Sequence, residues 1–387
     1  MLSPTLFPLF CALFLCLPVA VIFTVQRELT GVVSPEFGFR SLSVFSLYSR
    51  NVPDASSPAV PIRPIIPKDD ALLLRLASLV NPNQPPGSTR KLAFMYLTTT
   101  PLPFAPLWEK FFNGSSKELY NVYVHADPTR DYDPPFAGVF ANRVIHSEPS
   151  QRYTPTLAAA ARRIIAHALL DDPQNYMFAL LSPSCVPIRS FDFTYKTLVT
   201  SPSSRKSFIE ILKDEPWQYD RWAARGFDAM LPEVRLEDFR IGSQFWVLKR
   251  RHARVVARDR RIWEKFNQTC VREDTCYPEE NYFPTLLNMR DPRGCVPATL
   301  THVDWTINDG GHPRMYEPEE VAPELIVRIR KTRPRYGEDG INGSDWSANE
   351  RTDPFLFARK FSPEALEPLM GMARSVLFND SAGDDDV

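Results

Sequence analysis

Two adjacent glutamates are the first candidates for chemistry in this sequence. The stretch CYPEENYFPTLL, residues 276–287, places Glu279 and Glu280 between a cysteine and a run of aromatic and aliphatic residues. A carboxylate can act as a general base that takes the proton from an attacking hydroxyl. Neighbouring residues project in different directions on a strand or a helix, so these two acids cannot form the facing pair used in glycoside hydrolysis. We expect one acid to act alone, and the other to cap a helix that begins near Asn281 or to orient its neighbour.

The elements that must position these acids alternate between strands and helices. Strands are predicted over residues 91–100, 120–128, 142–148 and 176–188, and helices near 106–114 and over 155–172. This order predicts the α/β class with a mainly parallel central sheet. In open sheets of this kind ligands bind beyond the carboxyl ends of the strands. We therefore expect residues 98–100, 125–127 and 182–185 to lie close together.

The N-terminal segment has the composition of a membrane anchor. Residues 1–26 carry no charged side chain, and the apolar run from Leu6 to Val25 is about as long as a helix that crosses a bilayer. A cleaved signal peptide is the alternative, but its apolar core is shorter and is followed by small residues. The whole chain has 45 basic and 46 acidic residues, so its charge does not indicate a nucleic-acid partner.

The rest of the chain divides by composition. Residues 27–88 form a predicted proline-rich stem with a short helix over 71–80, residues 89–376 a folded domain, and residues 377–387 an acidic tail. Two further patterns favour a secretory lumen, namely cysteines outside the anchor and Asn-x-Ser/Thr triplets. The disulfide candidates are Cys185, Cys270, Cys276 and Cys295, and the glycosylation candidates are Asn113, Asn267, Asn342 and Asn379. Four cysteines allow three complete pairings, and the sequence does not choose among them.

Several blocks taken together resemble a known family. They occur in the family's order between about residues 90 and 376, and they are YVHADP, FALLSPSCVPI, RIGSQFWVLKRRHA, CYPEENYFPTLL, LTHVDWT and PFLFARKFSPEALEPLM. The chain resembles the core-2/I-branching β-1,6-N-acetylglucosaminyltransferases, and most of all their plant branch. The resemblance implies a type II Golgi membrane enzyme with a GT-A-like domain. It also implies inverting transfer from a UDP-sugar to a glycan without a metal ion or another cofactor.

The resemblance also implies roles for residues on the donor side. Glu280 matches the general base, Lys360 a lysine that contacts the diphosphate, and Asp127 an acid that contacts the nucleotide. A second basic residue corresponds to Arg328 or Arg330, and we favour Arg330. The simpler interpretations are two solvated acids at a helix N-terminus, a turn residue at Asp127, and ordinary solvated charge at the basic positions.

On the acceptor side the resemblance implies three candidates. Trp305 matches an aromatic residue that stacks on the acceptor sugar, which suits an indole ring, and a buried core tryptophan is the alternative. Glu210 and Arg221 are looser acceptor-binding candidates. The donated sugar, either GlcNAc-like or glucuronic acid, and the acceptor glycan are left open.

Metal ligands have little support in the sequence. Many GT-A enzymes hold a cation with an Asp-x-Asp motif at the end of a central strand, but here that strand ends in LLSPSC. Asp131 and Asp133 have the spacing, yet they lie in the proline-flanked loop TRDYDPP. His302, Asp304 and His312 match no standard ligand pattern. We therefore expect fixed cations to stabilise the leaving diphosphate.

One segment departs from the family pattern. In QRYTPTLAAAARR, Arg152 and Tyr153 occupy the positions of a Trp-Gly pair, and Ala161 that of an acid. This departure keeps open a second hypothesis, a non-catalytic lumenal module that binds nucleotide sugar or glycan. A third hypothesis, a hydrolase, requires a second carboxylate facing Glu280, and the sequence offers no evident one.

Overall fold

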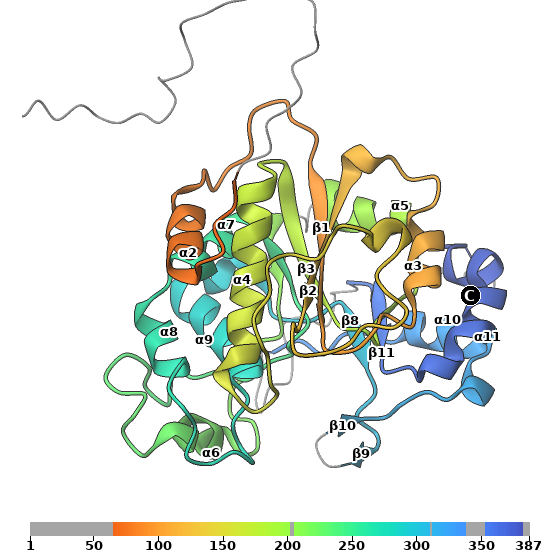
Figure 1. Cartoon of the computed structure of the whole chain (residues 1–387). Helices are drawn as coiled ribbons and strands as arrows, with labels where there is room; N and C mark the ends of the chain where they lie inside the picture. The colour runs from red at the N-terminus through yellow and green to blue at the C-terminus, as the bar shows by residue number, and fades with distance from the viewer. Residues whose placement is uncertain (1–64, 202–204, 310–311, 338–352, 382–387) are drawn as a thin grey trace, which may run out of the picture. The chain divides into compact units, whose positions relative to one another are not determined.

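The computed structural model describes residues 65–201, 205–309, 312–337 and 353–381 (Figure 1). The predicted anchor, residues 1–26, and the first part of the predicted stem lie outside these residues. Within the described ranges no helix is both long enough and apolar enough to cross a membrane.

The described chain alternates helices with short and long strands. The helices are α2 (Asp70–Leu79), α3 (Ala105–Phe112), α4 (Pro155–Asp171), α5 (Phe191–Tyr195), α6 (Gln218–Trp222), α7 (Arg250–Arg258), α8 (Arg261–Phe266), α9 (Pro278–Arg290), α10 (Pro323–Lys331) and α11 (Leu366–Gly371). The strands are β1 (Lys91–Thr98), β2 (Tyr120–Ala126), β3 (Asn175–Leu181), β4 (Val186–Pro187), β5 (Ser207–Phe208), β6 (Val247–Lys249), β7 (Cys295–Val296), β8 (Thr301–Val303), β9 (Asn308–Asp309), β10 (His312–Pro313) and β11 (Phe357–Arg359).

The central sheet has the order β2-β1-β3-β6-β5-β7. The β1/β2, β1/β3 and β5/β7 pairs are parallel, and the two pairs that involve β6 are antiparallel. The expected α/β class with a mainly parallel sheet is therefore confirmed. The strand predicted over 142–148 is wrong, because this segment contributes only a single bridge between Val144 and Val124.

Strand β1 shows why the sheet is covered on both faces. All eight of its residues are buried, as expected for a central strand. Successive side chains point to opposite faces, so Phe94 packs with the aromatic residues of α3 while Met95 packs with α4. In Figure 1, α2, α4, α7, α8 and α9 lie on one side of the sheet, and α3, α10 and α11 lie on the other.

Helix α4 follows from its local sequence. Thr154 caps its N-terminus by accepting from the Thr156 amide, Pro155 occupies the first turn, and an alanine-rich stretch continues the helix. Its predicted range, 155–172, agrees with the structure. Helix α2 packs against α4, and Arg163 donates to Asp70 across that contact at 2.6 Å. The folded body thus begins earlier than the predicted stem boundary at residue 88, because α2 buries Leu73 and Ala77.

A second sheet, β4-β11-β8, ties the C-terminal part of the chain to the end of β3. Strand β11 runs antiparallel to β4 and parallel to β8. The folded body also extends beyond residue 376, since the carboxylate of Asp380 accepts from the amide of Ser190 at 3.0 Å. The predicted tail therefore begins too early, and residues 382–387 lie outside the described ranges.

Candidate active site

The two adjacent glutamates lie in the first turn of α9. The helix begins at Pro278 rather than near Asn281, because proline suits the first helical turn, where its missing N–H is not needed. Glu279 and Glu280 are therefore inside the helix, where its positive N-terminal end stabilises negative charge. Neither of their side chains caps the helix, so the expected capping role of Glu279 is not observed.

Glu280 forms an ion pair within this first turn. Nη1 of Arg221 donates to its carboxylate at 2.8 Å, and 27% of the Glu280 side chain is exposed to solvent. The Arg221 guanidinium also lies over the ring of Tyr277, 4.4 Å from its centroid. The structure thus brings together two of the predicted site residues, and it leaves the carboxylate within reach of a substrate.

Glu279 has the opposite environment. Its side chain is 2% exposed, and its Oε2 is buried without a hydrogen-bond partner among the described residues. Burial and the neighbouring charge of Glu280 raise the pKa of Glu279 to about 8. The two adjacent acids therefore differ, because Glu279 carries little charge near neutral pH while Glu280 is paired with an arginine.

Glu210 approaches the same turn through Gly242. The Gly242 amide donates to the carbonyl oxygen of Glu280 at 2.9 Å, and a Cβ at Gly242 would stand 2.1 Å from the Glu210 carbonyl oxygen. Burial and the charges of Glu215 and Glu280 raise the pKa of Glu210 to about 7, although the charge of Arg335 opposes them. The backbone of Glu210 therefore lies close to Gly242, which is bonded to the first turn of α9, and the charge of Glu280 acts on the Glu210 carboxyl.

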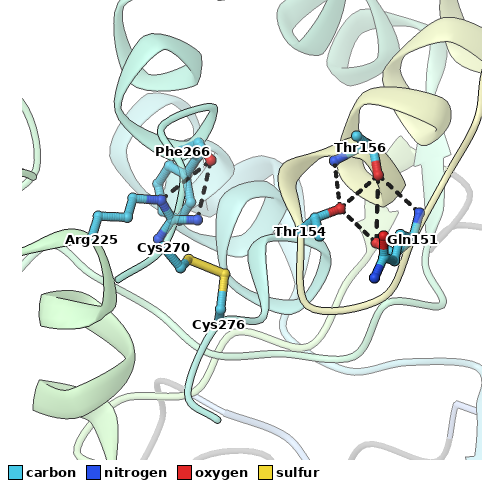
Figure 2. The surroundings of a disulfide bond; sticks show 7 residues. All are labelled: Gln151, Thr154, Thr156, Arg225, Phe266, Cys270 and Cys276. Carbon is cyan, nitrogen blue, oxygen red and sulfur yellow. Dashed lines mark hydrogen bonds between the residues drawn. A yellow bond between two sulfur atoms is a disulfide. The ribbon is translucent and has the colours of Figure 1, made fainter. Parts of the chain in front are cut away.

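A disulfide fixes the chain just before α9. Cys270 is bonded to Cys276, two residues before Pro278. Figure 2 shows this bond beside Arg225, whose guanidinium donates to the Phe266 carbonyl at 3.1 and 3.3 Å. The other two disulfide candidates, Cys185 and Cys295, are buried free thiols, because they lie on different parts of the fold.

Lys360 lies at the end of the central strand β3. Strand β11 pairs with β4 through Ala358 and Val186, so the continued register places Arg359 opposite Cys185. Lys360 follows directly and is partly buried. Burial lowers its pKa, and the positive charges of Arg359 and Arg152 lower it further. Two cations thus lie near the carboxyl end of β3, where the LLSPSC segment turns.

The two candidate arginines of α10 have different environments. Arg330 is buried, and it donates to the carbonyl oxygens of Ile188, Val376, Leu377 and Asn379 at 2.7–3.1 Å. Its guanidinium holds the C-terminal segment in place, so the preference for Arg330 over Arg328 as the diphosphate ligand is not supported. Arg328 is exposed. Burial lowers the pKa of His302, and the charge of Arg328 lowers it further.

Asp127 organises the loops at the carboxyl ends of β1 and β2. Its carboxylate accepts from the amides of Thr129 and Ser150, both at 2.8 Å, and from the Thr129 hydroxyl at 2.6 Å. Burial alone would raise the pKa of Asp127, but these hydrogen bonds hold it below its usual value. Its amide donates to the Thr98 carbonyl, so residues 98–100 and 125–127 do meet as expected.

Trp305 follows β8 and is 55% exposed, so the alternative of a buried core tryptophan is wrong. Val303 pairs with Arg359, which places Trp305 at the same end of the second sheet as Lys360. The neighbouring Asp304 accepts from Thr306 and from the Tyr316 hydroxyl. An indole ring is thus presented to solvent close to the two cations of β11.

The metal-ligand candidates do not form a cluster. Across the described ranges no three His, Cys, Asp or Glu side chains converge as metal ligands would. Asp131 and Asp133 are both exposed in their loop. Of the four glycosylation candidates, Asn113, Asn267 and Asn379 are exposed, whereas Asn342 lies outside the described residues.

The segment that departs from the family pattern packs against α9. Tyr153 has φ of 65°, in the left-handed region that favours glycine, and its ring lies 5.4 Å from that of Tyr277. Arg152 lies over the Tyr153 ring, 4.8 Å from its centroid. Arg359 was not among the predicted site residues, and Arg152 was named only for its departure from the family pattern. The available signal for Arg359 was its position directly before Lys360 in LFARKF.

Three residues form a second cluster that sequence reasoning missed. His252 contacts the Ser207 hydroxyl at 2.7 Å through Nδ1 and the Asp291 carboxylate at 3.1 Å through Nε2. Ser207 and His252 are fully buried. Serine, histidine and aspartate occur together in many hydrolases, but here a substrate could not reach the serine.

Comparisons with known proteins identify the family of this chain. Residues 92–330 match the family model described as Core-2/I-Branching enzyme. A protein named Glycosyltransferase BC10, from Oryza sativa subsp. japonica, is 30% identical to this chain over 323 residues. That match covers 75% of this chain and 78% of the rice protein.

Proposed function

The chain belongs to the Core-2/I-branching enzyme family, and we propose that it transfers a sugar from a UDP-sugar to a hydroxyl of a glycan with inversion at the anomeric carbon. Its α/β domain with a mainly parallel sheet fits a GT-A-like enzyme. The observation that carries the proposal is the presence of both a carboxylate that can take a proton and cations that can stabilise the leaving diphosphate. A carboxylate that is 27% exposed lies in the first turn of α9, and Arg359 lies opposite Cys185 in the register of β11 and β4, with Lys360 directly after it.

Glu280 is the general base in this proposal. The acceptor hydroxyl gives its proton to the Glu280 carboxylate, its oxygen forms the new bond to the anomeric carbon, and the bond to the UDP oxygen breaks. Arg221 orients the carboxylate, since it donates to Glu280 at 2.8 Å. The neutral form of Glu279 keeps a second negative charge away from the reacting atoms.

Lys360 stabilises the departing diphosphate. The electron pair of the broken bond stays on a phosphate oxygen of UDP, and a fixed cation beside that oxygen lowers the barrier to the reaction. Arg359 and Lys360 lie at the end of β3, where a metal-dependent enzyme would hold its ion, so we expect the reaction to need no metal. Arg328, which is exposed on α10, is the remaining candidate for the second cation.

Trp305 provides a surface for the acceptor sugar. Its exposed ring can cover the apolar face of a pyranose, and Glu210 and Arg221 are the polar candidates for acceptor binding. We expect the donated sugar to be GlcNAc-like or glucuronic acid. We also propose a type II orientation in the Golgi membrane, with residues 1–26 as the anchor and the catalytic domain in the lumen.

The test is transfer by residues 65–387, measured with a panel of UDP-sugars and glycan acceptors with and without EDTA. Transfer that survives EDTA and is lost in Glu280→Gln would support the proposal. A hydrolase, which would need a second carboxylate facing Glu280, is the alternative, so free sugar is measured as well. Release of sugar to water as the main product would favour that alternative. Binding of UDP without turnover would favour the non-catalytic module.

A further inference from the structure

We propose that Asn113 carries an N-linked glycan, and that the first sugars of this glycan lie in a cavity between α3 and strand β2. This inference rests on the lumenal orientation in the proposed function, because N-linked glycans belong to proteins of the secretory pathway. It assigns a modification site and a place for the glycan at the amino end of β2, whereas Asp127 lies at the carboxyl end of that strand.

The cavity has a volume of about 720 Å³ and lies beside the outermost strand of the central sheet. Side chains from residues 106–115, 117–122 and 138–143 line it, together with Met370 of α11. Strand β2 pairs with β1 on one side, and within the described ranges its other side has only the bridge from Val124 to Val144. The amino half of β2 therefore lines the cavity without a second neighbouring strand.

Asn113 reaches this cavity from a tight turn after α3. Its amide donates to the Lys110 carbonyl at 3.3 Å, and the Ser115 amide donates to the Phe112 carbonyl at 3.1 Å. Gly114 has φ of 83°, the left-handed value that the third position of a type II turn requires. Asn113 is exposed, and both it and Ser115 line the cavity. The acceptor asparagine and the hydroxyl residue of the Asn-Gly-Ser triplet are thus held at the cavity.

The lining combines polar and apolar side chains, as a sugar chain requires. A pyranose has hydroxyl groups around its edge and C–H groups on its faces, so it needs hydrogen-bonding groups beside apolar surface. The polar side chains of the lining are Glu109, Lys110, Lys117, Asn121 and Arg143. Val139 and Met370 are half-buried and add apolar surface. Because Asn113 itself lines the cavity, a glycan attached there begins among these groups.

Covalent attachment favours this ligand over a free sugar. A free sugar loses translational freedom when it binds, whereas a glycan joined to Asn113 is already held beside the cavity. Weak hydrogen bonds to exposed side chains such as Lys110 and Lys117 are then enough to keep the first sugars in place.

A glycan in this position also protects the sheet. The outer backbone of an edge strand can pair with another chain, and natural proteins cover or interrupt such edges. A bulky, soluble glycan over residues 120–122 would cover the amino half of β2. We therefore infer a structural role for the glycan, separate from the transfer reaction.

The first test expresses the full chain in eukaryotic cells and analyses each Asn-x-Ser/Thr triplet by peptide mass spectrometry. A peptide N-glycosidase converts a glycosylated asparagine to aspartate, so most molecules are expected to show aspartate at position 113. Ser115→Ala removes the hydroxyl that the triplet needs and should abolish this conversion. Ser116→Ala, the next residue in the chain, keeps the triplet and should leave the glycan in place.

The second test locates the glycan by amine labelling of lysines. Lys110 and Lys117 are exposed and line the cavity, and Lys331 is an exposed lysine of α10. The two cavity lysines should react about threefold more slowly in the glycosylated protein than in Asn113→Gln, because a ligand in a cavity covers the side chains that line it. Lys331 should react equally in both. Enzymatic removal of the glycan from the folded protein repeats the comparison without a substitution.

The outcomes separate this inference from the proposed function. A glycan at Asn267 or Asn379 with an unmodified Asn113 would overturn the inference and leave the lumenal orientation standing. Unmodified asparagines in all four triplets would overturn the lumenal orientation and the inference together, whereas sugar transfer by the same protein would still support the proposed reaction. A glycan at Asn113 that leaves the labelling of Lys110 and Lys117 unchanged would overturn its placement in the cavity.

Discussion

The Glu280 site and the Ser207–His252–Asp291 cluster contain equally reactive kinds of side chain in different surroundings. In the cluster, His252 is 0% exposed and both of its ring nitrogens are engaged. Ser207 also accepts from the Lys249 amide at 2.9 Å. Glu280, by contrast, has a quarter of its side chain open. Side chains of the right type can perform chemistry only where a substrate can reach them.

Burial favours the neutral form in both regions, but with different consequences. In the cluster it lowers the pKa of His252 to about 4, and a neutral imidazole then accepts or donates fixed hydrogen bonds. At the glutamate site it raises the pKa of Glu279 to about 8, whereas Glu280 is partly exposed and paired with Arg221. Burial therefore fixes hydrogen bonds of the fold in the Ser207–His252–Asp291 cluster. At the glutamate site it gives two adjacent acids different environments.

The largest expected effect is on the rate of transfer at the exposed Glu280 site. Glu280→Gln should lower the rate of transfer by about 10²–10⁴-fold, because the acceptor hydroxyl loses its base. Stability should change by no more than about 1 kcal/mol, since the pair with Arg221 is partly solvated. Kinetics and thermal unfolding of this variant are measured beside Glu237→Gln, an exposed control. A variant rate within threefold of the unaltered enzyme would contradict the assignment.

His252→Ala should give the opposite result. Removing the imidazole leaves a cavity and unpaired polar groups, so the free energy of unfolding should fall by about 4 kcal/mol. Turnover per folded molecule should stay the same. Denaturant unfolding and the rate of transfer are measured together, with the exposed His146→Ala as control. Loss of turnover without loss of stability would mean that the buried cluster takes part in catalysis.

The pH dependence of stability should reflect the same histidine. Burial depresses the folded-state pKa of His252 from 6.5 to about 4, so the unfolded chain binds the proton more readily. Its contribution is complete above pH 6.5 and is lost as the pH falls toward 4, which amounts to about 3 kcal/mol. His125 behaves in the same way. The free energy of unfolding, measured with urea at several pH values from 7 to 4, should therefore fall less steeply with falling pH in His252→Gln. The same steepness in the variant and the unaltered protein would contradict this origin.

Gly242→Ala should affect the glutamate site through the backbone. The new Cβ would stand 2.1 Å from the Glu210 carbonyl oxygen, so the backbone must shift at residue 242 or 210, which disturbs the hydrogen bond from the Gly242 amide to the Glu280 carbonyl. We expect a loss of about 2 kcal/mol in stability together with a lower rate of transfer. Gly371→Ala is the control, because its Cβ would meet no described atom within 4 Å. Equal behaviour of the two variants would show that the close approach does not matter.

Trp305→Ala should have the smallest effect. Loss of stacking is worth about 1 kcal/mol, so the KM for the glycan acceptor should rise about fivefold while UDP binding stays unchanged. Leu79→Ala removes another exposed apolar side chain, on α2, and serves as the control. An unchanged acceptor KM, measured at saturating donor, would remove Trp305 from the acceptor site.

The local sequence determined the main elements of this fold. The apolar runs of β1, β2 and β3 and the capped, alanine-rich pattern of α4 encode their structure within a few residues, because burial and helix capping act over short distances. The order of motifs likewise identified the family and pointed to Glu280. The short helix over 71–80 was found as well, although its pattern did not show that it packs against α4.

Only the tertiary structure decided how these residues interact. Arg221 and Glu280 are 59 positions apart, and their ion pair depends on how two distant segments dock. Arg330 was expected at the donor site, yet the C-terminal segment surrounds it with carbonyl groups. The different states of Glu279 and Glu280 arise from the layers packed around them. Desolvation and long-range pairing depend on neighbours that are far apart in the chain, so a local pattern carries too little information to fix them.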